Sequence, residues 1–155
     1  MVRRLFLILA LAGAVGSTNV VQESMAQEDD GLVLIAHPES GIKTLDRDTA
    51  VNLFMGRFTK LPSGITALPI DLESARDTFY LQLVNKRLPE INSYWARLVF
   101  SGRASPPRKV DHVEEVLEIV ANNRGAIAYV PRSVIDGRVV VVADLGALME
   151  KITGL

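Results

Sequence analysis

The chain has 155 residues, of which 48% are hydrophobic and 23% charged, and its formal net charge is −1. A chain of this length is the size of about one domain, and its near-neutral charge gives no reason to expect nucleic acid as a partner. It contains no cysteine, which excludes disulfide bonds, thiolate metal sites and a lipid-modified N-terminal cysteine.

The beginning of the chain has the pattern of a secretory signal peptide. Arg3 and Arg4 form a basic start, residues 5–15 are all apolar or glycine, and Ser24-Met25-Ala26 fits a small-x-small cleavage site. The apolar run is shorter than the ~20 residues that a membrane-spanning helix needs. We therefore expect cleavage after Ala26, a periplasmic or secreted mature chain of residues 27–155, and no membrane span after cleavage. A short membrane anchor is the alternative.

Strand and helix patterns alternate through the rest of the chain. Continuous apolar runs favour strands that are covered on both faces, as in a parallel sheet. Apolar residues spaced by three and four favour helices with one buried face. The alternation predicts one α/β domain with a mostly parallel sheet flanked by helices. Strands are predicted at residues 32–36, 65–70, 126–130 and 139–142, and helices at 46–55, 74–84, 88–100, 111–122 and, weakly, 144–152.

The predicted helix at residues 88–100 carries an aromatic and aliphatic stripe. Its members are Ile91, Tyr94, Trp95, Leu98 and Val99. This spacing is typical of a core-facing helix side, which we favour over a ligand platform. A basic cluster of Arg103, Arg108 and Lys109 follows it around a Pro-Pro pair. It is either a solvated loop or a patch for a partner protein.

Motifs of the common enzyme classes are missing from the sequence. Only two histidines exist, His37 and His112, and they form no H-x-x-x-H pair. Neither a G-x-S-x-G elbow nor a glycine-rich nucleotide loop is present. We therefore expect a protein that is not an enzyme, with no catalytic residue, no metal and no cofactor.

The stretch from residue 65 to 84 is the strongest candidate for a binding site. It reads as a strand, a polar turn and a helix, a unit that leaves backbone N–H groups free at the end of a strand, where small anions bind. Ser74 either caps the helix together with Asp77 or offers a hydroxyl to a ligand. Arg76 either contacts an oxyanion, or is a solvated helix residue, or forms a salt bridge to Glu73 or near Tyr80.

Three motifs in order resemble the phosphate-binding proteins of ABC transporters. They are Leu45-Asp46-Arg47 leading to Leu53-Phe54-Met55-Gly56-Arg57, then Tyr94-Trp95-Ala96-Arg97-Leu98-Val99-Phe100-Ser101-Gly102, and Gly125-Ala126-Ile127-Ala128-Tyr129-Val130. The resemblance implies a type 2 periplasmic-binding-protein-like fold and solute capture rather than catalysis. At this length it implies one lobe. Ser74, Ala75 and Arg76 are the positions that match the ligand-binding residues of the family.

Two functions remain open from the sequence. One is a secreted binding protein with weak or degenerate affinity for phosphate or a similar small oxyanion. The other is an interaction module that keeps the fold, has lost the ligand site, and docks on an envelope protein, on an ABC transporter partner or on itself. A hydrolase with an unrecognised site is a third and weaker hypothesis.

Overall fold

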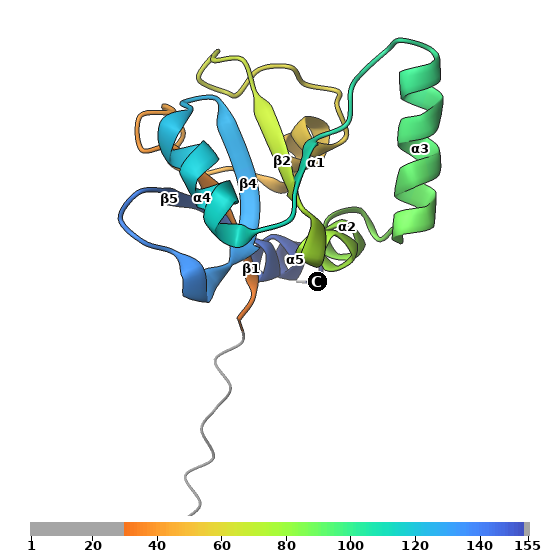
Figure 1. Ribbon diagram of the computed structural model, residues 1–155. Coiled ribbons are helices and arrows are strands. Elements are labelled where there is room, and N and C mark those ends of the chain that lie inside the picture. The colour runs from red at the N-terminus through yellow and green to blue at the C-terminus, as the bar shows by residue number, and fades with distance from the viewer. Residues whose placement is uncertain (1–29, 154–155) are drawn as a thin grey trace, which may run out of the picture.

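A computed structural model describes residues 30–153. The predicted signal peptide at residues 1–26 therefore lies outside the described residues. The described chain forms a five-stranded mixed sheet with helices on both faces, which confirms the predicted α/β class (Figure 1). Within this part of the chain, no helix combines the length and apolarity that crossing a membrane requires.

The sheet has the strand order β3-β2-β4-β1-β5. β2 pairs in parallel with β3 and β4, whereas β1 pairs antiparallel with β4 and β5. The predicted strand at residues 32–36 is thus confirmed, and all five of its residues are buried, but its partners run in the opposite direction. Burial on both faces explains the continuous apolar run without parallel pairing. The strands are β1 (Leu32–Ala36), β2 (Leu68–Leu72), β3 (Arg108–Val110), β4 (Ala126–Pro131) and β5 (Val140–Asp144).

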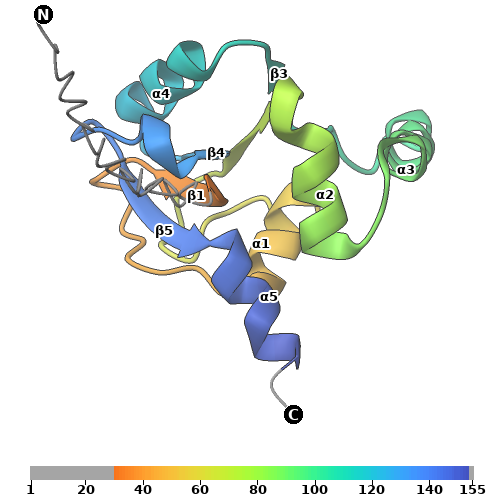
Figure 2. The ribbon, with the colours of Figure 1, turned by 90° about the horizontal axis from the view of Figure 1, so that it is seen from below.

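The helices divide between the two faces of the sheet. α4 covers one face, and α1, α2 and α5 gather on the other (Figure 2). α3 lies beyond α2 at the side of the molecule in both views. The helices are α1 (Arg47–Phe54), α2 (Arg76–Val84), α3 (Leu88–Phe100), α4 (Val113–Asn122) and α5 (Leu145–Thr153), with short 3₁₀ turns at Glu73–Ala75 and Arg132–Val134.

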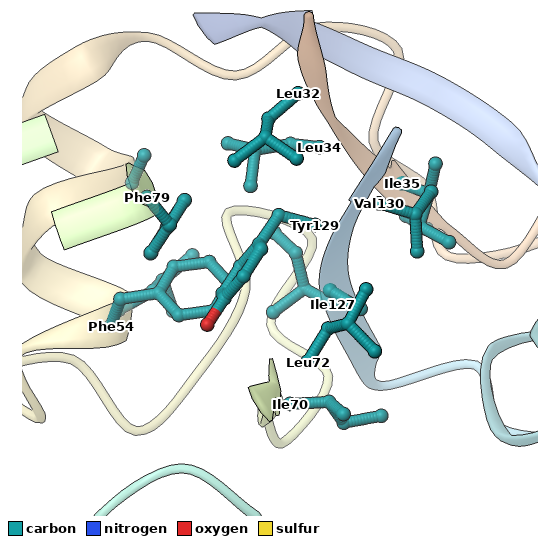
Figure 3. Packing of buried hydrophobic residues seen from close by; sticks show 14 of the residues in the cluster. Leu32, Leu34, Ile35, Phe54, Ile70, Leu72, Phe79, Ile127, Tyr129 and Val130 are labelled. Carbon is teal, nitrogen blue, oxygen red and sulfur yellow. The ribbon is translucent and has the colours of Figure 1, made fainter. Parts of the chain in front are cut away.

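An aromatic cluster fills the space between the sheet and the helices of the second face. The rings of Phe79 from α2 and Tyr129 from β4 stack with centroids 3.7 Å apart and planes 7° apart, and Phe54 from α1 packs edge-on against Phe79 at 4.8 Å (Figure 3). All three side chains are fully buried. On the opposite side of the sheet, Ile35 and Val130 face away from this cluster. The sheet is therefore covered on both faces, as its apolar strands require.

α3 is less buried than its sequence pattern predicts. Ile91 and Trp95 are its only buried residues, whereas Val99 is 54% exposed. The assignment of Val99 to the core is therefore wrong. The middle of α3 lies near the end of α1, where the Tyr94 hydroxyl donates a hydrogen bond of 2.7 Å to the Met55 carbonyl. In its last turn Leu98 is still partly buried against the core, whereas Val99 and Phe100 are exposed, so the stripe leaves the core at the end of the helix.

Candidate functional site

The chain passes from β2 into α2 through a 3₁₀ turn at Glu73–Ala75. Ser74 is exposed on this turn, and Ala75 is the residue before the first turn of α2. No side chain caps α2, so the predicted Ser74–Asp77 capping pair does not form. The physical reason is that the 3₁₀ turn delays the start of α2 to Arg76, which leaves Ser74 two positions before the first helical residue.

Arg76 turns inward from the start of α2. It is only 3% exposed, and its Nε donates a hydrogen bond of 2.9 Å to Oδ2 of Asp71. Its Nη2 donates to Oδ1 of Asn92 on α3 at 3.2 Å, and its Nη1 lies 3.8 Å from a Glu73 carboxylate oxygen. The predicted Glu73 contact therefore exists, but the shorter ion pair with Asp71 dominates the surroundings of the guanidinium.

Asp71, on β2, is the centre of this network. It is 1% exposed and accepts hydrogen bonds from three side chains. Besides Arg76, the hydroxyl of Tyr80 donates to Oδ1 at 3.0 Å, and the hydroxyl of Tyr129 donates to the same oxygen at 3.1 Å. The network thus joins β2, β4 and α2, and each buried polar group in it has a partner, as buried polar groups require.

The protonation of this network follows from its burial. Loss of solvation raises the pKa of Asp71 above its ordinary value, while hydrogen bonding and the charge of Arg76 oppose that rise. Burial and the nearby Asp71 carboxylate raise the pKa of both Tyr80 and Tyr129. Both tyrosines therefore stay neutral donors, and Arg76 supplies the positive charge that a buried carboxylate needs.

The ligand residues predicted from the sequence are not gathered around a free positive charge. Ser74 and Arg76 are two residues apart, yet one faces water and the other faces the core. Arg76 is neutralised by Asp71, and Glu73 adds a further negative charge at the surface end of the guanidinium. Arg76 and Asp71 thus form an internal ion pair, and the hydroxyl of Ser74 lies outside it, in water.

Sequence reasoning named Glu73 as a partner of Arg76 but missed the closer ion pair with Asp71 and the contact with Asn92. We interpret Asp71 from the sequence as part of a polar turn, whereas the structure places it inside β2 between Ile70 and Leu72. A carboxylate flanked by apolar strand residues was the available signal, because such a residue needs a buried cation or donors. Nothing in the sequence pointed to Tyr129, which is 58 positions away from Asp71.

A pocket of about 330 Å³ lies at the opposite end of β2. It is bounded by the end of α1, by the loop between α1 and β2, and by the segment at residues 103–107 that leads into β3. Arg103 and Phe58 line it together with the hydroxyl-bearing residues Thr59, Thr66 and Ser105. Within residues 30–153, no group of three or more His, Asp or Glu side chains is placed to hold a metal ion.

Comparison with solved structures identifies the fold. Residues of this chain superpose on an ABC-type phosphate transport receptor from Vibrio cholerae with a TM-score of 0.56 and 13% identity, over 72% of this chain and 45% of that one. A structure described as a phosphate ABC transporter substrate-binding protein with bound phosphate, from Clostridium perfringens, gives a TM-score of 0.56 at 19% identity, over 72% and 44%. A third, described as a possible phosphate binding protein from Planctomyces limnophilus, gives 0.52 at 9% identity, over 72% and 40%.

These similarities show an α/β fold that resembles part of phosphate-binding protein structures. The chain spans less than half the length of the solved proteins that it matches. No protein-family model matches the sequence, and no curated protein matches it significantly. The fold therefore agrees with the resemblance found in the three motifs, while the identities are too low to transfer a ligand.

Proposed function

We propose that this chain is an interaction module of the cell envelope, which keeps the fold of a phosphate-binding protein but does not capture a solute at Ser74, Ala75 and Arg76. The observation that carries the proposal is the buried ion pair between Arg76 and Asp71. A positive charge that is already paired inside the protein has little attraction left for an external oxyanion. With the predicted signal peptide removed, residues 27–155 would work in the periplasm or outside the cell, and not as an enzyme.

The electrostatics of the site support this proposal. Phosphate at the Ser74 hydroxyl would approach Glu73 at the surface and Asp71 below it, with Arg76 as the only cation that the network supplies. To bind phosphate directly, Arg76 would have to leave Asp71. Leaving a buried carboxylate without its partner costs about 3–5 kcal/mol, which a solvent-exposed contact with phosphate does not offset.

Capture of a small oxyanion is the competing proposal. It is supported by the fold, since the solved Clostridium perfringens protein is described with bound phosphate, and by the exposed hydroxyl of Ser74. In that case the ligand would use Ser74 and the backbone near Ala75, and Arg76 would act through its remaining donors. Such a site would be weak, because most of the anion would stay in water.

Titration calorimetry with inorganic phosphate separates the two proposals. We expect no saturable heat at millimolar phosphate, either for the wild-type chain or for Ser74→Ala, whose side chain is exposed and therefore not needed for folding. A matched titration with sodium chloride at equal ionic strength corrects for dilution and screening. Saturable binding by the wild type that is lost in Ser74→Ala would overturn the interaction proposal and establish oxyanion capture.

A further inference from the structure

We propose that one end of the molecule docks on the surface of an anionic phospholipid bilayer. We call it the basic apolar end. It consists of the C-terminal turns of α3, the segment at residues 101–107 and the loop at residues 55–67. The inference rests on the proposed function, because it names the surface on which the interaction module docks. It uses a region far from the Asp71–Arg76 network, at the opposite end of β2.

Exposed apolar side chains concentrate at the basic apolar end. Among the residues that the structure describes, three large hydrophobic side chains are exposed: Phe58 at 47%, Val99 at 54% and Phe100 at 96%. Phe58 lines the pocket, and Val99 and Phe100 are the last two residues of α3. Single exposed hydrophobics are ordinary, but a concentration of them at one end marks a surface for a partner or a membrane.

The same end is strongly basic. Residues 55–67 and 97–107, which form this end, contain four arginines and lysines and no acidic residue, although the whole chain has a net charge of −1. Arg57, Lys60, Arg97 and Arg103 are exposed there, and none of them forms an ion pair with another described residue. Arg108 is excluded from this set because it lies 3.5 Å from Glu115. Exposed apolar side chains that lie among unpaired cations favour binding to an anionic membrane surface.

The pocket fits the phosphate group of a lipid headgroup. Arg103 and three hydroxyl-bearing residues, Thr59, Thr66 and Ser105, are among the residues that line it. Cationic and hydroxyl donors are the groups that contact phosphate oxygens. Phe58, at the same pocket, would then lie toward the acyl chains. The pocket and the exposed aromatic residues therefore belong to the same proposed membrane-binding surface.

The shape of this end favours a bilayer over an acidic protein. Figure 1 shows the turn after α3 and the loop between α1 and β2 at the same end of the molecule, at the top of the view, away from the beginning of β1. Both segments can therefore meet one flat surface together. Phe100, at 96% exposure, projects from α3 and is not among the residues that line the pocket. A fluid surface accepts a projecting ring, whereas a protein partner would need a preformed cavity for it.

Vesicle co-sedimentation of the full chain tests the proposal. Vesicles of phosphatidylcholine with about 30% phosphatidylglycerol serve as the probe, and pure phosphatidylcholine vesicles are the neutral comparison. We expect Arg97→Gln and Arg103→Gln each to lower the partition coefficient on the anionic vesicles about fivefold, and more at low salt than at high salt. Phe100→Ser should lower it by a similar factor. The matched control is Lys86→Gln, which removes an exposed cation just before the start of α3, at the opposite end of that helix from Phe100, and should change nothing.

Three other outcomes would overturn the proposal in distinguishable ways. The apolar run at residues 5–15 is common to all variants, so equal partitioning of every variant would assign vesicle binding to that run and refute the basic apolar end. Binding to soluble poly-glutamate that Arg103→Gln abolishes, without such an effect on vesicles, would assign this end to an acidic protein. A dimer in light scattering that Phe100→Ser dissociates would assign it to a second copy. None of these results depends on phosphate binding, which tests the proposed function separately.

Discussion

Replacing Asp71 by asparagine tests whether Arg76 is held by an internal ion pair. Asparagine keeps the shape of the side chain and one acceptor oxygen but removes the negative charge. Asp71 is 1% exposed, so the guanidinium of Arg76 would remain buried with no counterion within the network except the more distant Glu73. Removing one partner of a buried pair costs about 3–5 kcal/mol. This is a large part of the total stability of a domain, which is about 5–15 kcal/mol.

The double variant Asp71→Asn/Arg76→Met makes the test specific. It removes both charges and keeps an unbranched side chain at position 76. Replacing both members of a buried pair is often close to neutral, so we expect the double variant to recover most of the stability lost by Asp71→Asn. The matched control is Glu90→Gln, which breaks the exposed ion pair with Lys86, keeps an acceptor oxygen for the Arg87 amide at the start of α3, and should leave stability unchanged within error.

Urea unfolding followed by tryptophan fluorescence measures these differences. Trp95 is the single tryptophan of the chain and is buried on α3, so its emission reports on this part of the fold. Far-ultraviolet circular dichroism provides a second probe of two-state behaviour. If Asp71→Asn is as mild as Glu90→Gln, or if the double variant is less stable than Asp71→Asn alone, the ion pair is not what holds Arg76, and the argument against oxyanion capture loses its basis.

Three further predictions concern the two buried tyrosines and the start of α1. Tyr80 and Tyr129 have raised pKa values, so in alkaline titration the tyrosinate absorbance should stay at or below one third of its value in denaturant until the protein unfolds, because the chain has three tyrosines. The unfolded chain releases these protons near pH 10 and the folded chain does not, so stability should fall as the pH rises above about 10. Asp46 accepts a hydrogen bond of 2.9 Å from the Thr49 amide, so Asp46→Ala should cost about 1 kcal/mol in urea unfolding. Ser74→Ala should cost nothing measurable, and an equal loss in both variants would contradict the cap assignment.

Periodicity in the sequence predicts most of the secondary structure but little of how the strands pair in the sheet. The apolar runs at residues 32–36 and 126–130 are strands because both of their faces are covered, which is a local consequence of composition. Whether a neighbour runs parallel or antiparallel depends on the path of the chain between the strands. β1 therefore has the predicted burial, but its partners are antiparallel rather than parallel. β3 is three residues long and carries two exposed cations, so it shows no apolar pattern to detect.

Part of the candidate site could not be predicted from the sequence, because it depends on tertiary packing. A serine three residues before an acidic residue matches a capping box, but the same residues fit a 3₁₀ turn, and only tertiary packing decides between them. Here the buried ion pair with Asp71 accompanies a helix that begins at Arg76. Pairing Arg76 with Asp71 could be suspected from the buried strand position of the carboxylate. The hydroxyl of Tyr129 in the same network depends on the β2–β4 pairing, which the sequence does not reveal.

The two ends of β2 are connected through α3. Arg76 donates a hydrogen bond to Asn92 in the first half of α3, and Phe100 ends the same helix eight residues later, about 12 Å along its axis. Because α3 buries only Ile91 and Trp95, its position depends more than usual on such polar contacts. We infer that the arginine matched to solute binding serves here to hold the helix that presents Phe100. On this view Asp71→Asn should weaken vesicle binding as well as stability, because a loosened α3 no longer holds its exposed end in line with the loop at residues 55–67.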